Sequence, residues 1–177
     1  MLSQVVQDAL NDQINMEFYS SYNYLAMSAY CERVNFRGCA NWLRAQSQEE
    51  YMHGMKLYNF LVARNGRVML KEIKAPLTDY VSLPQVFEQA LDQELDVSRR
   101  IDALYELAFR EKAFAALVEL QWFIAEQVEE ERTTRDIVAK FALVKDDPSA
   151  LLDLDRELGT RVSAGRSSGA AAGNPAG

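Results

Sequence analysis

Four glutamates interrupt stripes of otherwise apolar residues. Three- and four-residue steps along four segments of the chain trace these stripes, and a carboxylate lies near the middle of each, at Glu17, Glu50, Glu94 and Glu130. A buried carboxylate without a partner is unfavourable, and four that converge repel one another. A bound multivalent cation removes both problems. The sequence therefore predicts a cation site inside a helical bundle.

The single histidine of the chain strengthens this prediction. His53 lies one helical turn after Glu50, so both side chains point at the same spot. Glu50 follows Glu17 by 33 residues, and Gln127 follows Glu94 by the same interval, which predicts two related helical hairpins. Carboxylates with an imidazole suit iron(II), manganese(II) or zinc(II). This pattern is the ligand plan of carboxylate-bridged dinuclear iron or manganese proteins.

The last long segment contains more acid than two ions require. Its sequence AEQVEEER places several carboxylates within about one turn of one another. Such a run is usually a solvated helix face. Converging carboxylates would instead form an additional cation site beside the main pair, made of Glu49, Glu126, Glu129 and Glu130. Glu131 points elsewhere and is assigned to the surface.

Helical patterning predicts the elements that hold these residues. No proline occurs before Pro76, and five of the eight glycines lie at or beyond Gly159. Four long segments between these breaks show helical rather than alternating patterning, over residues 3–33, 38–65, 82–111 and 113–144. A short fifth helix is expected from Pro148 to Leu158.

The connections predict how the helices pack. Short joints after the first and third helices favour antiparallel hairpins. Residues 66–82 have weak helical signal and contain Pro76, and this stretch is long enough to run the full height of a bundle. Ser82 is the expected N-cap of the third helix, with Pro84 in its first turn. The predicted fold is therefore all-α: a ferritin-like four-helix bundle with one long crossover and a short fifth C-terminal helix.

Length and charge restrict the domain organisation and the partners. The 177 residues fit one compact domain, expected over residues 1–158. Residues 159–177 are mostly Gly, Ala, Ser and Arg and are expected to form a flexible tail. With 19 Lys plus Arg against 26 Asp plus Glu, the formal charge is −7. This balance argues against nucleic-acid binding and suits cationic partners.

The cysteines, together with the lack of a signal-peptide or membrane-spanning pattern, predict the cellular compartment. Cys31 and Cys39 have no C-x-x-C spacing and are expected to be reduced thiols. The first basic side chain is Arg33, so a signal peptide is not expected. The longest apolar run covers only residues 113–118, far short of the about 18 needed to span a bilayer. We expect a cytoplasmic protein without a membrane partner.

At this point the residues resemble a family. Glu17 with Tyr24, then QEEYMH, QELD and LQWFIAEQVEEE in this order are similar to the non-haem bacterial ferritins over about residues 1–158. The resemblance implies a homo-oligomer of 24 subunits that encloses a cavity. It also implies ferroxidase activity, in which dioxygen oxidises Fe(II) to Fe(III), and storage of a hydrous ferric oxide mineral.

The resemblance also implies roles for individual residues. Glu17, Glu50 and His53 would hold one iron of a di-iron centre. Glu94 and Glu130 would hold the second iron, with Glu50 as the bridge and Gln127 in the near shell.

Further roles follow from the same resemblance. A third iron site would use Glu49, Glu126, Glu129 and Glu130. Tyr24 would lie beside the centre as a hydrogen-bond donor and one-electron donor. Trp122 is either an auxiliary electron donor or a packed aromatic residue.

Two related families fit less well. Bacterioferritins have a second Glu-x-x-His on the fourth helix, where this chain has Gln127-x-x-Glu130. Their haem-ligating methionine directly follows the glutamate of the second helix. Tyr51 occupies that position here, and Met52 lies about 100° further around the helix, so no haem is predicted. Rubrerythrins need a second histidine, which this chain lacks.

Other functions remain as alternatives. A non-catalytic helical protein that binds partner helices would contain no metal and would tolerate Glu50→Ala. A monooxygenase would use the same dinuclear site with a substrate pocket. A DNA-protecting role would suit a basic tail, but this tail has only Arg161 and Arg166.

Overall fold

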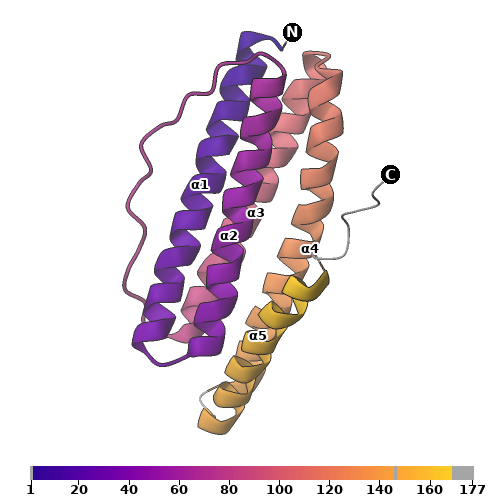
Figure 1. The fold of residues 1–177 in the computed structure, drawn as a ribbon. Coiled ribbons are helices and arrows are strands. Elements are labelled where there is room, and N and C mark those ends of the chain that lie inside the picture. Colours follow the sequence, from indigo (N-terminus) through magenta and orange to yellow (C-terminus); the bar gives the residue numbers. More distant parts are fainter. Residues whose placement is uncertain (1, 146, 169–177) are drawn as a thin grey trace, which may run out of the picture.

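The computed structural model describes residues 2–145 and 147–168, with side chains described as far as residue 160. It contains five helices: α1 (Gln4–Arg33), α2 (Arg37–Ala63), α3 (Leu83–Arg110), α4 (Phe114–Val144) and α5 (Pro148–Ser168). Helices α1 to α4 lie side by side as a bundle, and the α2–α3 connection runs along its outside (Figure 1). The predicted four-helix bundle with one long crossover is confirmed.

Local backbone chemistry ends the helices close to where the sequence predicts. One residue with positive φ follows each of the four bundle helices, at Asn35, Asn65, Lys112 and Lys145. A positive φ takes the backbone out of the right-handed helical conformation and so interrupts helical hydrogen bonding at each position. At the start of α3, the predicted cap is present, because the Gln85 N–H donates a hydrogen bond of 3.3 Å to the Ser82 hydroxyl.

Side chains of α1 hold the crossover in place. The Asn11 amide donates to the carbonyl of Arg67 at 2.9 Å and accepts from the Met69 N–H at 2.7 Å. One turn later, the Asn15 amide donates to the Met69 carbonyl at 3.1 Å and accepts from the Lys71 N–H at 2.7 Å. These side-chain amides satisfy backbone groups of a segment that forms neither helix nor strand.

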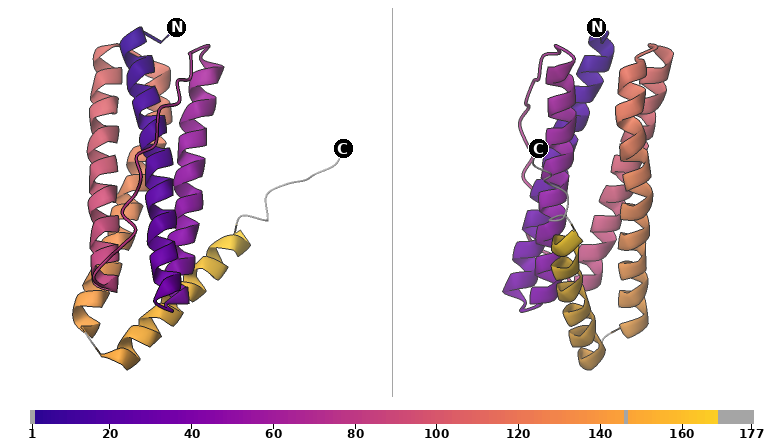
Figure 2. Two further views of the ribbon diagram at one scale, coloured as in Figure 1. Left: turned by 90° about the vertical axis from the view of Figure 1, so that its left-hand side faces the viewer. Right: turned by 45° about the vertical axis from the view of Figure 1, so that its right-hand side comes forward.

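Helix α5 is longer than predicted. It continues beyond Leu158 to Ser168, whereas the sequence pattern indicated an end near the glycine at 159. The rest of the predicted tail, residues 169–177, lies outside the described residues. In both views of Figure 2, α5 lies at the lower end of the bundle, and its packing is mainly against α2.

A close approach fixes this packing of α5. A Cβ atom at Gly38 would lie 1.7 Å from the carbonyl oxygen of Asp155, so only glycine fits there. The Cys39 N–H donates to the Asp155 carboxylate at 2.8 Å. Phe36, at the N-cap of α2, offers no side-chain cap. A carboxylate from α5 therefore caps α2.

The core is divided by a polar layer. One buried apolar cluster includes Leu43, Phe87 and Ile137, and the other includes Leu10 and Ile101. Each cluster draws on all four bundle helices, so the two fill different lengths of the bundle. Between them lie the buried carboxylates and amides of the middle turns. Among the described residues, no helix is both long and apolar enough to cross a membrane.

Candidate metal centre

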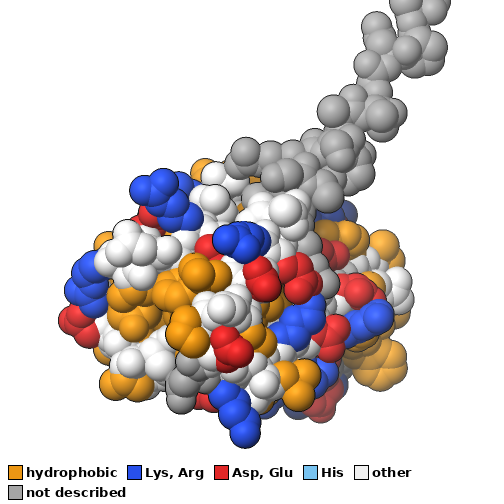
Figure 3. Space-filling model, turned by 90° about the horizontal axis from the view of Figure 1, so that it is seen from below, with side chains coloured by type: hydrophobic (Ala, Val, Ile, Leu, Met, Phe, Trp, Pro, Cys, Tyr) orange, Lys and Arg blue, Asp and Glu red, His pale blue; other side chains and the backbone are white. Residues whose placement is uncertain are grey.

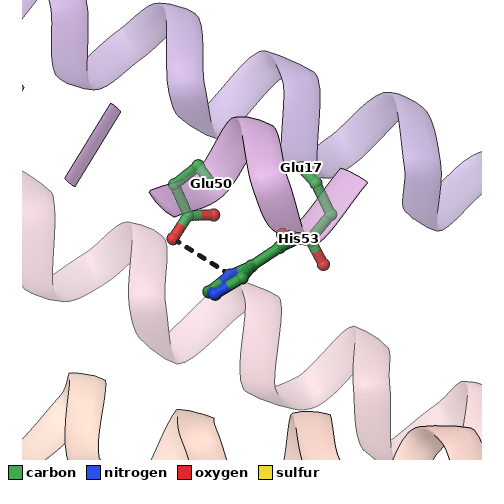
Figure 4. A group of neighbouring side chains, drawn as sticks. All are labelled: Glu17, Glu50 and His53. Atoms are coloured by element: carbon green, nitrogen blue, oxygen red, sulfur yellow. Dashed lines mark ion pairs between the residues drawn. The ribbon is translucent and has the colours of Figure 1, made fainter. Parts of the chain in front are cut away.

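Glu17, Glu50 and His53 converge at one point inside the bundle. Glu17 comes from α1, and the other two come from α2, one turn apart (Figure 4). One ligand atom from each lies within 4.8 Å of those of the other two. The exposed fractions of the three residues are 0%, 0% and 6%. The predicted convergence of a carboxylate pair with an imidazole is therefore present.

Three of the four carboxylate oxygens at this point lack hydrogen-bond partners in the described part of the chain. Among the described residues, Glu17 Oε2 and both oxygens of Glu50 have no hydrogen-bond partner, although His53 Nδ1 lies 3.6 Å from Glu50 Oε1. The other oxygen of Glu17 accepts a hydrogen bond of 2.8 Å from the Gln13 amide. Buried carboxylate oxygens without donors are unfavourable unless a cation binds them. The donor set, oxygens with one imidazole nitrogen, fits iron(II), manganese(II) or zinc(II).

A second group of candidate ligands, Glu94 on α3 and Glu130 on α4, is held by hydrogen bonds from other helices. The Tyr24 hydroxyl donates to Glu94 Oε1, and the Gln127 amide donates to Glu94 Oε2 at 3.3 Å. Glu130 Oε2 accepts from the Gln46 amide at 2.8 Å. All five residues are buried. The predicted neighbourhood of Tyr24, Glu94 and Gln127 is thus present as a hydrogen-bonded network.

Burial dominates the electrostatics of the carboxylates. It raises the pKa of Glu17 from 4.5 to about 7 and that of Glu130 to about 8. Burial also raises the pKa values of Glu50 and Glu94, and the Glu94 carboxylate adds to the effect on Glu50. Without a cation, the cluster therefore retains protons near neutral pH. A cation that binds there must displace them.

The burial of His53 favours the neutral imidazole, which is the form that can bind a metal. Burial, with a smaller contribution from Lys56, lowers its pKa from 6.5 to about 4. The imidazole is therefore uncharged at neutral pH, and its contact of 3.6 Å with Glu50, the dashed line in Figure 4, is not a charged pair there. The Trp122 ring packs edge-on against the imidazole at 5.3 Å, and Lys56 Nζ lies 4.8 Å above the indole. The proposed redox role of Trp122 stays a prediction.

The structure brings together only part of the predicted third site. Partial burial and the Glu126 carboxylate raise the pKa of Glu49, and both carboxylates help to raise that of Glu130. Glu129 is exposed, and its carboxylate pairs with Arg132 at 4.0 Å. Glu49, Glu126 and Glu130 are therefore electrostatic neighbours, although Glu49 is itself exposed, whereas Glu129 pairs with Arg132 instead.

Several supporting residues were not predicted from the sequence. Gln13 lies one turn before Glu17 on the same helical face, so the spacing of four residues could have indicated their hydrogen bond. Gln46 is different, because it donates to Glu130 on another helix, and no local pattern predicts that contact. Ser98 donates to Glu131 at 2.5 Å and accepts from the Gln127 amide at 3.3 Å. Glu131, expected at the surface, is thus half-buried beside the cluster and helps to raise the pKa of Glu94.

The side chains relevant to haem lie on the outside of α2. Tyr51 is 51% exposed and Met52 is 62% exposed. The predicted absence of haem stays a prediction.

Known proteins have sequences similar to this one. The Ferritin-like domain family matches residues 7–144. The chain is 38% identical over 162 residues to the bacterial non-heme ferritin of Staphylococcus aureus strain MRSA252, covering 92% of this chain and 98% of that protein. It is also 38% identical over 161 residues to the bacterial non-heme ferritin of Staphylococcus haemolyticus, covering 91% and 97%.

Solved structures share the fold. An open-pore ferritin from the hyperthermophilic archaeon Archaeoglobus fulgidus is 45% identical, with a TM-score of 0.89 over 90% of this chain and 98% of that chain. A humanized archaeal ferritin has the same identity and TM-score over 90% and 96%. With the family match over most of the chain, these similarities show that the protein belongs to the ferritin family.

Proposed function

We propose that this protein is a ferroxidase that oxidises Fe(II) with dioxygen and stores the ferric product. The observation that carries the proposal is the convergence of Glu17, Glu50 and His53, with three buried carboxylate oxygens that have no hydrogen-bond partner. One Fe(II) substrate would bind these three residues. A second would bind Glu94 and Glu130, with Glu50 between the two ions.

The chemistry of the site favours oxidation of this substrate. Each Fe(II) gives up one electron, and the two electrons together reduce one dioxygen to the level of peroxide. Anionic oxygen ligands stabilise Fe(III) more than Fe(II), so the carboxylates lower the reduction potential. Hydrogen bonds from Tyr24 and Gln127 hold Glu94 in place while the charge on the metal changes. Protons released from the carboxyls when iron binds are available for the reduced dioxygen.

The proposal includes a site for the product. Glu49 and Glu126 are electrostatic neighbours of Glu130. Their carboxylate oxygens would form a third site, which an oxidised ion enters when it leaves the di-iron centre. Glu129 would contribute only if its side chain turned away from Arg132.

We further propose that 24 copies enclose a hollow shell in which the mineral grows. The surface supports assembly, since large apolar side chains are widely exposed, among them Phe114 at 70%, Val81 at 87% and Leu143 at 81%. On the lower end of the molecule, apolar side chains gather in patches between acidic and basic ones (Figure 3). The relatives and solved structures are named as ferritins, which agrees with an iron store. The cytoplasmic location stays a prediction.

An anaerobic titration tests the proposed activity. Fe(II) is added to apoprotein without oxygen, the mixture is exposed to oxygen, and visible absorption is followed by stopped flow. We expect saturation at two Fe(II) per subunit and a fast oxidation phase of the same stoichiometry. Preloading with Zn(II) should block that phase, because Zn(II) takes the same ligands and has no redox chemistry. Iron oxidation no faster than in buffer would favour a non-catalytic helical protein.

A further inference from the structure

Gly54 lies directly beside the metal ligands, in the interior of a long helix. It follows His53 in α2, and it is buried. A glycine in the middle of a helix is unfavourable relative to alanine, so its presence needs a local reason.

The neighbouring helix supplies that reason. A Cβ atom at Gly54 would lie 2.7 Å from Phe18 Cε1, 2.9 Å from Phe18 Cδ1 and 3.3 Å from Glu17 Cβ. The first two contacts are too short for any real side chain. Glu17 and Phe18 of α1 thus lie against the bare backbone of α2 at the residue that follows a ligand.

The two contacts differ in how they can relax. The Phe18 ring also packs on Tyr51, with centroids 5.6 Å apart, and both rings line an outer groove of about 550 Å³. The ring can therefore swing outward into open space. The Cβ atom of Glu17 is bonded to the α1 backbone, so it moves only if α1 itself moves away from α2.

We propose that Gly54 is a positioning residue for the metal centre. Because it places no side chain between α1 and α2, it sets the separation at which the Glu17 carboxylate meets Glu50 and His53. The inference rests on the proposed function, because it concerns how the proposed metal ligands are placed. Its test is the binding of cobalt(II) without oxygen, which requires no oxidation.

The experiment compares Gly54→Ala with wild type, with Glu17→Gln and with Met52→Ala. Cobalt(II) is titrated into wild type and variants, and both affinity and the coordination-sensitive visible spectrum are recorded. Gly54→Ala should bind the first cobalt(II) about ten-fold more weakly or worse, as is typical when support of a ligand is lost. Its spectrum should shift toward that of Glu17→Gln. Met52→Ala, an exposed change one residue before His53, should retain wild-type affinity and spectrum.

A second variant keeps the test informative if Gly54→Ala does not fold. Phe18→Ala removes the ring that makes the two shortest contacts and leaves the contact with Glu17 Cβ. In that background, Gly54→Ala should fold and should still weaken cobalt(II) binding relative to Phe18→Ala alone.

The outcomes separate this inference from the proposed function. The positioning role would be overturned if Gly54→Ala had wild-type cobalt(II) affinity and spectrum, or if Gly54→Ala lost no affinity in the Phe18→Ala background. Neither result would contradict the proposed ferroxidase function. Failure of the wild type to bind cobalt(II) would overturn both.

Discussion

Two adjacent glutamates in α2 should differ in what their loss does. Glu50 is fully buried between the other ligands, whereas Glu49 is exposed and neighbours Glu126. Glu50→Ala should abolish the fast paired oxidation, because it removes the residue proposed to bridge the two ions. Glu49→Ala should leave the first fast phase near its normal rate and change the fate of the product. The affected quantities are the iron oxidised per dioxygen and the recovery of the centre for later turnovers.

Stopped-flow absorbance and oxygen uptake measure these quantities. Both variants are tested at two Fe(II) per subunit and then with a large excess of iron. If Glu49→Ala eliminates the first phase as completely as Glu50→Ala does, the separation of a catalytic pair from an accessory site is wrong.

The protons held by the cluster predict a pH dependence of apoprotein stability. The folded-state pKa values of Glu17 and Glu130, about 7 and about 8, lie above the ordinary 4.5, so the folded state binds more protons. The stability that these protons provide is complete below about pH 4.5 and is lost as pH rises through 7 to 8. Folded His53 is neutral between pH 6.5 and 8, but the unfolded histidine, with its ordinary pKa of 6.5, is partly protonated at the lower limit, so this residue opposes the decrease by only a few tenths of a kcal/mol.

Thermal unfolding of metal-free protein tests this dependence. From pH 6.5 to 8, the free energy of unfolding should fall by an amount on the order of 2 kcal/mol. Glu17→Gln and Glu130→Gln should each flatten the decrease. Glu129→Gln is the matched control, because its carboxylate is exposed and pairs with Arg132. A decrease of the same size in all three variants would contradict the assignment to the cluster.

At the scale of elements, the docking of α5 on α2 has two separable parts. Asp155→Ala removes the cap of α2 and should cost about 1 kcal/mol of unfolding free energy, whereas Asp155→Asn retains an acceptor and should cost less. Gly38→Ala places a methyl group 1.7 Å from a backbone oxygen and should cost about 2 to 3 kcal/mol. Denaturant unfolding of the three variants measures the order. A Gly38→Ala variant as stable as wild type would show that α5 docks differently.

The sequence predicts helices well where strong periodic signals exist, and less well elsewhere. Ser82 and Pro84 correctly indicate the start of α3, because capping chemistry is local. The end of α5 was placed too early, since Gly159 was interpreted as a helix stop. In the structure, a Cβ atom added at Gly159 would lie 3.2 Å from the Cα atom of Gly38, so this glycine serves close packing inside the helix. Tertiary contacts of this kind leave no local pattern.

The same distinction applies to the site. Glu17, Glu50 and His53 were identifiable, because a charged residue in an apolar stripe violates helical patterning. The contact of Gln46 with Glu130 depends on how two helices face each other, and the ion pair of Glu129 depends on side-chain orientation. The first contact is not encoded in spacing, whereas the three-residue step from Glu129 to Arg132 permits the second without requiring it.

At the scale of the whole molecule, assembly is the main expectation. A shell of 24 subunits would have a mass of about 24 times 20.1 kDa, near half a megadalton. Size-exclusion chromatography with light scattering of purified protein measures this mass, and electron microscopy should show hollow particles. A monomer at micromolar concentration would contradict the shell.

The hydrogen bonds between α1 and the crossover have a consequence for amide hydrogen exchange. Asn11 and Asn15 bind the N–H groups of Met69 and Lys71, and no partner for the intervening Leu70 N–H occurs among the described residues. Exchange along this segment should therefore alternate, slow at Met69 and Lys71 and fast at Leu70, as along the edge of a β-sheet. Asn11→Ala should remove the protection at Met69 and leave that at Lys71. Helix α1 would thus give the crossover beside it an exchange pattern that repeats every two residues.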